Sequence, residues 1–409
     1  MSKSEAPNYN HLKTMWEYLT TKYEFKRDIV KTRILWRDSG SKTEYEVLQD
    51  EKLNTMSLNM GLQGFKSCTP ANIYPFLFSE YTPTYSPIVE YMQRVGKKNP
   101  TGAIDKLAET LKTHNDKAFK KYFKKWIVAS VANSLTPYGC QNHTCLTLVG
   151  GQGKGKTTWL ENLCPRLLYP DYIYTGELDL GKKSDTIWKL AEYFLINIEE
   201  QIKGLNKADA NTMKQLITLP HIKGRRPYGR LEATGIRVAN FMASTNDEDF
   251  LTDSSGSRRY LCFKVLDIKA DYKKIKMDDV WAEAFNLFND KNFIYWISSE
   301  DIAELEDNNK DFKHVTQEHE YITQYFSVPN DKHPATHIAP STAIRDFIKQ
   351  ETFNQVLKER NVGIALKSLG YEQISYRFEW THNPIKGWAV HLNKETKNTL
   401  FTRYAKLPF

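Results

Sequence analysis

The sequence has few cysteines, and their spacing fits neither a disulfide framework nor a structural zinc site. The 409 residues contain five of them: Cys68, Cys140, Cys145, Cys164 and Cys262. A scattered odd number is typical of a reducing compartment. Cys140 and Cys145 flank His143, but the second ligand pair of a structural zinc site is missing from the sequence. We therefore expect neither disulfides nor a zinc ion.

Long apolar runs and a strong charge of one sign are also missing. No stretch approaches the roughly 18 apolar residues of a membrane span, and the first residues lack the apolar core of a signal peptide. The 57 Lys+Arg and 49 Asp+Glu residues give a net charge of +8. This modest excess suits a polyanionic partner without requiring one. We expect a cytoplasmic protein with no membrane partner.

What is present is an alternation of short apolar runs with helical patterns between residues 136 and 270. This alternation predicts an α/β layer with a mainly parallel sheet. The runs are Cys145–Val149, Tyr193–Ile198, Arg237–Ala243 and Tyr260–Val265. We expect the core domain to span 136–330, with a helical extension at its end.

The flanking regions have different patterns. Residues 1–100 predict an α+β accessory region, and 101–135 predict a helical, collar-like segment. The proline-rich stretch 327–340 resembles a linker. In 331–409 two helical patterns precede two strand patterns around 381–387, an order that favours a winged-helix domain.

The helical segment has a lysine face with two interpretations. Its lysines recur at steps of three and four residues, opposite the aromatic residues Phe119, Tyr122, Phe123 and Trp126. The lysines concerned are Lys117, Lys120, Lys121, Lys124 and Lys125. They form either a solvated face over a core stripe or a ridge that faces phosphates.

A glycine-rich stretch follows the first apolar run directly. Its pattern, G-x-x-x-x-G-K-[ST], turns backbone N–H groups toward phosphate oxygens, and only glycine lets the backbone approach so closely. We expect Lys156 to neutralise the β and γ phosphates and Thr157 to ligate Mg²⁺. The predicted nucleotide-binding residues are Gly150, Gly151, Gln152, Gly153, Lys154, Gly155, Lys156, Thr157 and Thr158.

Polar residues follow the next two runs. Glu199 and Glu200 come directly after Tyr193–Ile198, and Asn246 follows Val238–Thr245. We expect Glu199 to steady the hydration shell of Mg²⁺ and Glu200 to polarise the attacking water. Asn246 is expected to orient that water and sense the γ-phosphate; the alternative is an asparagine that merely caps a turn.

Two groups of cations complete the set. Arg258 and Arg259 open the fourth run, where they are either solvated or able to reach the phosphates of a neighbouring subunit. Residues 221–235 predict a hairpin whose cations contact DNA phosphates and whose tyrosine stacks on a base, or else a solvated surface hairpin. The hairpin candidates are Lys223, Arg225, Arg226, Tyr228 and Arg230.

These motifs together resemble the superfamily 3 helicases, a branch of the AAA+ ATPases. More narrowly, the sequence resembles the virulence-associated protein E family of phages and mobile elements, over residues 100–330. The motifs are Phe123-x-x-Trp126, Gly150–Thr157, Arg226–Arg230, Ser244-Thr-Asn246 and Gly256–Tyr260. One departure is Asn197, which interrupts an otherwise apolar strand before the acids, so Glu199 and Glu200 can exchange roles.

The resemblance implies a P-loop AAA+ core that uses ATP and Mg²⁺. It implies a homo-oligomeric, hexameric ring that moves along single-stranded DNA and opens forked DNA during replication of the element. An arginine at 258 or 259 would then reach the nucleotide of the next subunit. We find no second acidic set for primer synthesis, so a primase would be either a separate partner chain or a lost N-terminal extension. The alternative function is a nucleotide-switched DNA-binding protein, such as a replication initiator or defence component, without processive unwinding.

Overall fold

A computed structural model describes residues 9–136, 139–181, 183–202, 207–226, 231–251, 254–313, 316–353, 356–378, 380–393 and 404. The chain divides into two compact units, and each is treated by itself. The first comprises residues 1–248 and 256–311, and the second comprises 249–255 and 312–409. Among the described helices none is both long enough and apolar enough to cross a membrane.

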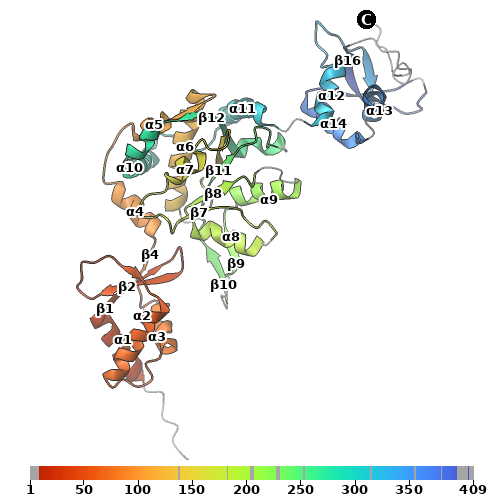
Figure 1. The fold of residues 1–409 in the computed structure, drawn as a ribbon. Coiled ribbons are helices and arrows are strands. Elements are labelled where there is room, and N and C mark those ends of the chain that lie inside the picture. Colours follow the sequence, from red (N-terminus) through yellow and green to blue (C-terminus); the bar gives the residue numbers. More distant parts are fainter. Residues whose placement is uncertain are drawn as a thin grey trace, which may run out of the picture. The chain divides into compact units, whose positions relative to one another are not determined.

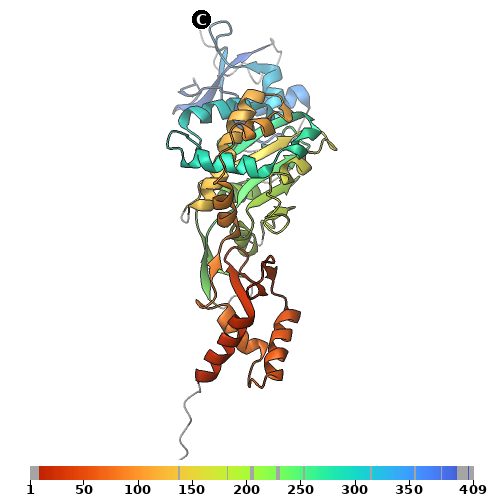
Figure 2. The same ribbon diagram turned by 90° about the vertical axis from the view of Figure 1, so that its left-hand side faces the viewer.

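The first unit begins with a small α+β region. Helix α1 (Tyr9–Lys22) leads without a break into β1 (Tyr23–Asp28), as Figure 2 shows. β1 pairs antiparallel with β2 and parallel with β4, in a sheet of order β3-β2-β1-β4. The other elements are β2 (Arg33–Asp38), β3 (Glu46–Val47), α2 (Asp50–Leu62), α3 (Pro70–Leu77) and β4 (Thr84–Tyr85). Met15, Phe25, Met56 and Ile73 belong to its own apolar core.

The segment 101–135 was predicted to be helical, but it also contains a short strand. It contains α5 (Ala103–Ala108), the short strand β5 (Leu111–Thr113) and α6 (Asp116–Leu135), after α4 (Pro87–Val95). Leu111 and Thr113 are buried while Lys112 is exposed, the alternation of a strand. β5 joins the edge of the main sheet antiparallel to β12, and this pairing overrides the helical pattern around it.

The main sheet has six strands in the order β5-β12-β6-β11-β8-β7, and all but β5 are parallel. The central strands β6, β8 and β11 are almost entirely buried, as expected for a parallel sheet covered on both faces. The strands are β6 (Cys145–Val149), β7 (Ile173–Thr175), β8 (Leu195–Glu199), β11 (Asn240–Thr245) and β12 (Tyr260–Ile268). The predicted α/β class with a mainly parallel sheet is therefore confirmed.

Helices cover this sheet. Side chains of α6, α7 and α10, including Trp126, Trp159 and Trp281, share one core with Leu146 and Phe263 of the strands. Figure 1 shows α8 and α9 on the opposite side of the strands from α10. The helices are α7 (Lys156–Glu161), α8 (Lys183–Glu192), α9 (Lys207–Thr218), α10 (Met277–Asn289) and α11 (Ser299–Asn308). The hairpin β9 (Ile222–Arg225) and β10 (Glu232–Gly235) is antiparallel, and η1 (Ser254–Arg259), η2 (Ala270–Lys274) and η3 (Lys310–Phe312) are 3₁₀ turns.

The second unit is built around β16, which pairs antiparallel with β13, β14 and β15. Its elements are α12 (Gln317–Tyr325), β13 (Phe326–Ser327), β14 (His337–Ala339), α13 (Ser341–Thr352), α14 (Glu359–Ser368), β15 (Gln373–Tyr376) and β16 (Ile385–Leu392). The predicted order of two helices and two strands is observed. The expected linker 327–340 is not only a linker, because all three residues of β14 are buried against this sheet.

Candidate active site

The glycine-rich loop (Gly150–Thr157) leaves the carboxyl end of β6 and leads into α7. Gly150, Gly153 and Gly155 have φ angles of 150°, 78° and 80°. L side chains rarely adopt these conformations. A Cβ atom at Gly150 would also lie 3.0 Å from the Val265 carbonyl oxygen of β12. The loop therefore needs glycine for its backbone conformation and for its close approach to the neighbouring strand.

Lys156 is the buried cation of this loop. Its Nζ donates to the carbonyl oxygens of Gly150 and Gly151 at 2.6 and 2.9 Å, and to Oδ1 of Asn246 at 3.0 Å. Burial lowers the pKa of Lys156, while the Glu200 carboxylate acts in the opposite direction. The ammonium group is thus held inside the curve of the loop by groups that phosphate oxygens can replace.

The structure brings Asn246 and Lys156 together although they are far apart in the sequence. β11 lies beside β6 in parallel, so its carboxyl end meets the start of the loop. Since an ammonium group only donates, the oxygen of the Asn246 amide faces Lys156. Nδ2 is then the atom left to donate to a phosphate or a water molecule.

The acids lie at the same edge, on the other side of β11. Glu199 is the last residue of β8 and pairs in register with Ser244, whose Oγ lies 3.2 Å from Oγ1 of Thr157. Glu200 follows with a φ of 51°, and its N–H donates to the Ser244 carbonyl oxygen at 3.0 Å. Glu199 is half-buried and Glu200 is exposed, so the two carboxylates have different surroundings.

The donor set at this edge fits Mg²⁺ better than zinc. The described residues include no cluster of three or more His, Cys, Asp or Glu side chains that could hold a metal ion. Mg²⁺ needs no such cluster, because it keeps several waters and binds through one or two protein oxygens and substrate phosphates. The Thr157 hydroxyl and the Glu199 carboxylate would supply those oxygens.

Other predicted loop residues have different surroundings. Gln152 and Thr158 are exposed. Lys154 is turned away from the loop interior, because its Nζ donates to the carbonyl oxygens of Val265 and Leu266 at 3.1 and 3.4 Å. In this conformation Lys154 links the loop to β12 by hydrogen bonds and does not face a ligand.

Arg258 and Arg259 lie at the opposite end of the sheet. Tyr260 pairs with Cys145, the first residue of β6, whereas the loop begins only after Val149. At about 3.3 Å per residue, the arginines and the loop are separated by roughly 20 Å along the strands. Neither arginine can reach a phosphate on its own loop.

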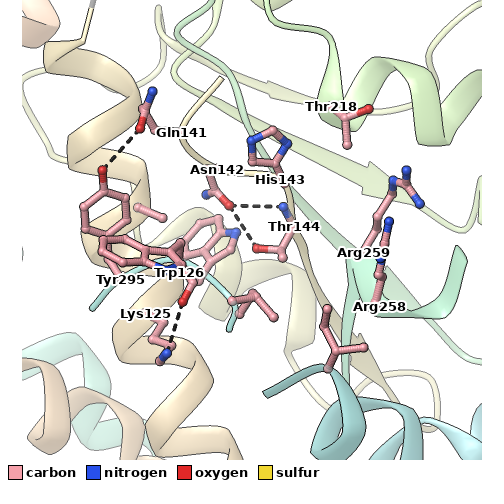
Figure 3. A pocket seen from close by; sticks show the side chains of 14 residues that line it. Lys125, Trp126, Gln141, Asn142, His143, Thr144, Thr218, Arg258, Arg259 and Tyr295 are labelled. Carbon is pink, nitrogen blue, oxygen red and sulfur yellow. Dashed lines mark hydrogen bonds between the residues drawn. The ribbon is translucent and has the colours of Figure 1, made fainter. Parts of the chain in front are cut away.

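A cavity of about 440 Å³ opens beside these arginines. Figure 3 shows both arginine side chains on one side of it, with Trp126 and Tyr295 across from them and His143 between. The Nε atom of Arg259 is buried and has no hydrogen-bond partner among the described residues. At least one donor at this cavity, the Nε–H of Arg259, is therefore not used by the described part of the chain.

The predicted hairpin is present, but its described cations differ from one another in exposure and contacts. Lys223 and Arg225 of β9 are exposed. Arg226 is half-buried: its guanidinium lies 4.5 Å from the centre of the Trp188 ring and donates to Thr32. Burial accordingly lowers the pKa of Arg226. Tyr228 and Arg230 lie outside the described residues.

The lysines of α6 are largely paired within the chain. Lys121 and Lys125 lie 2.7 and 2.6 Å from the carboxylate of Asp301, and Lys124 lies 2.6 Å from Asp105. Lys120 pairs with Glu109 at 2.7 Å. These contacts favour the interpretation of a solvated, paired face over that of a phosphate ridge.

At the carboxyl edge, the sequence predicted no role for Ser244 and indicated Asn197 only as an interruption of an apolar strand. Ser244 belongs to the Ser244-Thr-Asn246 motif and contacts Thr157, and its place beside β8 is visible only in the sheet register. Asn197 is completely buried, and both polar atoms of its side chain lack a hydrogen-bond partner among the described residues. It nevertheless stays in register within β8, which leaves Glu199 as the last strand residue.

Comparison with protein families finds one match. The virulence-associated protein E-like domain matches residues 95–314, which is more than half of the chain. This range includes every predicted site residue from the glycine-rich loop to the arginine pair. A comparison with curated proteins gave no match.

Solved structures similar to this chain include two of the NrS-1 C-terminal region. The apo structure of residues 305–718 has a TM-score of 0.51 at 12% identity and covers 93% of this chain and 99% of its own. An A-form apo structure of the region has a TM-score of 0.49 at 13% identity, with the same coverages. An active helicase of SCCmec type IV, Cch, scores 0.35 at 9% identity over 89% of this chain and 92% of its own. The first of these shows a shared fold.

Proposed function

Since this chain belongs to the family of virulence-associated protein E-like domains, we propose that it is an ATP-hydrolysing DNA helicase. In this proposal the chain forms a ring, hexameric by resemblance to superfamily 3 proteins, and acts in replication of a phage or mobile element. Forked and single-stranded DNA are its substrates, and a separate primase is a candidate partner.

One observation carries the proposal. At the carboxyl ends of β6 and β11, Lys156 donates to Asn246 and Thr157 lies in hydrogen-bond contact with Ser244, while Glu199 ends the adjacent strand and Glu200 follows it directly. In open α/β sheets, ligands bind outside the carboxyl ends of the strands. A buried lysine within a loop of positive-φ glycines is suited to a polyphosphate.

The residues at this edge divide the work of hydrolysis. Mg²⁺ held by Thr157 and Glu199 would supply positive charge to the phosphates. Lys156 gives up its carbonyl contacts and neutralises the charge that spreads over the transferred phosphoryl group. Glu200 polarises the attacking water, and the Nδ2 atom of Asn246 orients it. The neighbouring subunit supplies Arg259, or Arg258, because neither reaches the loop of its own chain.

The flanking elements provide the DNA contacts. Lys223 and Arg225 on the exposed arm β9 would contact phosphates in the channel, with Arg230 and Tyr228 proposed from the sequence alone. The second unit has the order of a winged-helix domain, with α14 before the antiparallel strands β15 and β16. We assign it to DNA or partner binding.

The alternative is a nucleotide-switched DNA-binding protein that does not unwind. Both functions use the same nucleotide site and hairpin, so the reaction itself must separate them. The test is strand separation of a forked duplex by the purified protein with ATP, with a non-hydrolysable analogue, and by Lys156→Ala with ATP. We expect unwinding only by the unaltered protein with ATP. DNA binding and ATP hydrolysis without strand separation would favour the switch.

A further inference from the structure

The β1–β2 turn, residues 29–32, attaches the N-terminal region (α1 to β4) to the six-stranded sheet. Arg33, directly after the turn, lies 2.6 Å from Asp171 in the segment before β7. The hydroxyl of Tyr172, the next residue, donates to the buried carboxylate of Asp28 at 2.5 Å. The turn is thereby held where the edge strand β7 begins.

The conformation of this turn is unusual at Thr32. Its φ is 53°, a left-handed conformation that β-branched residues rarely adopt. The Asp28 carboxylate fixes the turn, because it accepts the N–H groups of Val30 and Lys31 at 2.9 and 3.1 Å. The Nζ atom of Lys31 also lies 3.3 Å from the centre of the Tyr193 ring. Strained residues persist where the structure fixes them and are concentrated at functional sites, so Thr32 is a candidate for a role beyond forming the turn.

Thr32 contacts the hairpin to which we assign DNA binding. Arg226, directly after β9, donates from its guanidinium to the Thr32 hydroxyl. A guanidinium cannot accept, so the hydroxyl oxygen is the acceptor of this bond. The same guanidinium lies 4.5 Å from the centre of the Trp188 ring in α8. Arg226 therefore contacts both the turn and α8, one residue beyond the proposed DNA contact Arg225.

Trp188 in turn contacts both arms of the hairpin. Its Nε1 donates to the carbonyl oxygen of Arg225 in β9 at 3.1 Å. A Cβ atom at Gly235 in β10 would lie only 2.8 Å from the Trp188 ring, so the ring packs directly against the backbone there. The hairpin is thus attached to α8 through Trp188 and to the N-terminal region through Thr32.

Apolar packing between the turn and the hairpin is incomplete. A cavity of about 230 Å³ is lined by Ile29 and Val30 of the turn and by Thr234 and Ile236 at the end of the hairpin. Arg226 lines it as well. Side chains that face a void lose the dispersion contacts that would hold them in place. The polar contact between Thr32 and Arg226 therefore limits a movement of the hairpin that apolar packing does not prevent.

We propose that Thr32 is a positioning residue for DNA binding, through which the N-terminal region holds the hairpin in its DNA-binding conformation. The inference rests on the proposed DNA contacts of Lys223 and Arg225. A binding segment that is held in place loses less conformational freedom when it binds, and its affinity is higher for that reason. Thr32 itself contacts no phosphate in this proposal, so the number of neutralised phosphates does not depend on it.

The test measures binding of labelled single-stranded DNA to the full chain by fluorescence anisotropy over a series of salt concentrations. Thr32→Val keeps the β-branched shape and removes the acceptor. It should weaken DNA binding by about 5-fold, as expected for one lost hydrogen bond. The loss should be the same at every salt concentration, because the slope of log K against log salt reports only phosphate contacts. Thr32→Ser keeps the hydroxyl and should bind DNA like the unaltered chain.

A double-mutant cycle tests whether the effect passes through Arg226. Arg226→Ala should weaken DNA binding without changing the salt slope. Adding Thr32→Val to Arg226→Ala should cause no further loss, because residues that act through one contact are not additive.

Thr55→Val is the matched control within the N-terminal region. Thr55 is exposed like Thr32, and its Oγ1 donates to the Glu51 carbonyl oxygen at 2.9 Å. This variant should bind DNA like the unaltered chain. ATP hydrolysis without DNA should be unchanged in Thr32→Val and in Thr55→Val, and thermal unfolding shows whether each is folded. If Thr32→Val does not fold, Thr32→Gly takes its place with the same expectation, because glycine suits the positive φ.

Several results would overturn the inference. Folded Thr32→Val that binds DNA like the unaltered chain, or Thr32→Ser that binds as weakly as Thr32→Val, would show that the hydroxyl does not position the hairpin. A smaller salt slope in Thr32→Val would show that the turn contacts phosphate itself. Additive losses in the cycle would exclude Arg226 as the link. If replacing Lys223 and Arg225 by Ala leaves DNA binding unchanged, the proposed function of the hairpin is wrong, and the inference fails with it.

Discussion

The two ends of the main sheet present different kinds of polar site. At the carboxyl end Lys156 is hydrogen-bonded to Asn246 and Thr157 lies against Ser244, with Glu199 at the end of the adjacent strand and Glu200 directly after it. At the amino end Arg258 and Arg259 border a cavity of about 440 Å³, and Arg259 keeps a buried Nε without a partner among the described residues. At one end the polar side chains are hydrogen-bonded in pairs, and at the other a buried guanidinium nitrogen has no acceptor among the described residues.

This difference has a geometrical cause. In a parallel sheet all carboxyl ends meet at one edge, so loop, acids and Asn246 converge, while residues that begin a strand are placed a strand length away. The arginines therefore serve a phosphate only if another copy of the chain brings one to them. In the proposed ring, the two ends would be complementary halves of a single site between neighbouring subunits.

The strongest challenge to this comparison is Arg259→Ala. An arginine supplied between subunits typically contributes roughly 10³ to 10⁵ in rate, so we expect a loss of ATP hydrolysis near that of Lys156→Ala. Mixing the two inactive variants should restore part of the activity, since some interfaces regain both an intact loop and an intact arginine. Arg258→Ala is the matched control for the assignment.

Two outcomes of the mixing experiment would contradict the prediction. If mixed rings, confirmed by mass, recover no ATPase activity at any ratio, Arg259 does not act on the nucleotide of the neighbouring subunit. If ATP hydrolysis per subunit is unchanged when the protein is diluted to a proven monomer, hydrolysis does not require a ring.

Glu200→Gln sharpens the description of the carboxyl end. Loss of a general base typically costs about 10² to 10⁴ in rate, and we expect such a fall in ATP turnover with nucleotide binding retained. Glu199→Gln, the neighbouring acid, should instead weaken the dependence on Mg²⁺. The reverse pattern in steady-state hydrolysis would show that the two acids exchange roles.

The hairpin tests the DNA side of the proposal. Replacing Lys223 and Arg225 by Ala should weaken single-stranded DNA binding and reduce the slope of log K against log salt by about 1.4, because two phosphate contacts are lost. Arg226→Ala should leave the slope unchanged and lower thermal stability, since Arg226 packs on Trp188 and bonds to Thr32. If the unaltered chain, the double variant and Arg226→Ala all show the same slope, the hairpin does not contact DNA.

The smallest expected effect is a change in stability, and it concerns the ion pairs between Asp301 and the lysines of α6 near the amino end of the sheet. Hydrogen bonds from Lys121, Lys125 and the Ser298 backbone outweigh burial and lower the pKa of Asp301. A carboxyl group whose pKa is lower in the folded than in the unfolded state stabilises the fold when the pH is above its unfolded-state pKa, which is about 3.9 for Asp. This stabilisation is lost progressively as the pH falls from there through the folded-state pKa. Asp301→Asn should cost about 1–3 kcal/mol at pH 7, measured by urea unfolding, and less at pH 3.5.

An exposed pair is the matched control for that measurement. Asp307 and Lys310 lie 2.7 Å apart with side chains 76% and 67% exposed. Asp307→Asn should leave the unfolding free energy unchanged within the error of the measurement, because solvent screens an exposed ion pair. A loss for Asp301→Asn that does not shrink at low pH would show that packing, not the ion pairs, is its cause.

The second unit and the lysine face show where sequence patterns fell short. The buried strand β14 lies in a proline- and histidine-rich stretch that predicted a linker, because its burial depends on pairing with β16 about fifty residues later. The lysines of α6 have two interpretations by spacing alone. Their carboxylate partners, above all Asp301 far along the chain, are brought to them by tertiary packing.

The sequence by itself determined four of the five parallel strands, all but the short β7, together with the glycine-rich loop and the identity of the polar residues at the strand ends. These follow from local facts: apolar runs of strand length, glycines where φ is positive, and residues that immediately follow a strand. Only the tertiary structure decided that Asn246 meets Lys156, that Ser244 meets Thr157, and that Arg226 packs on Trp188. Strand order and register set these contacts, because neighbours in a sheet are chosen by packing across the whole domain and not by distance along the chain.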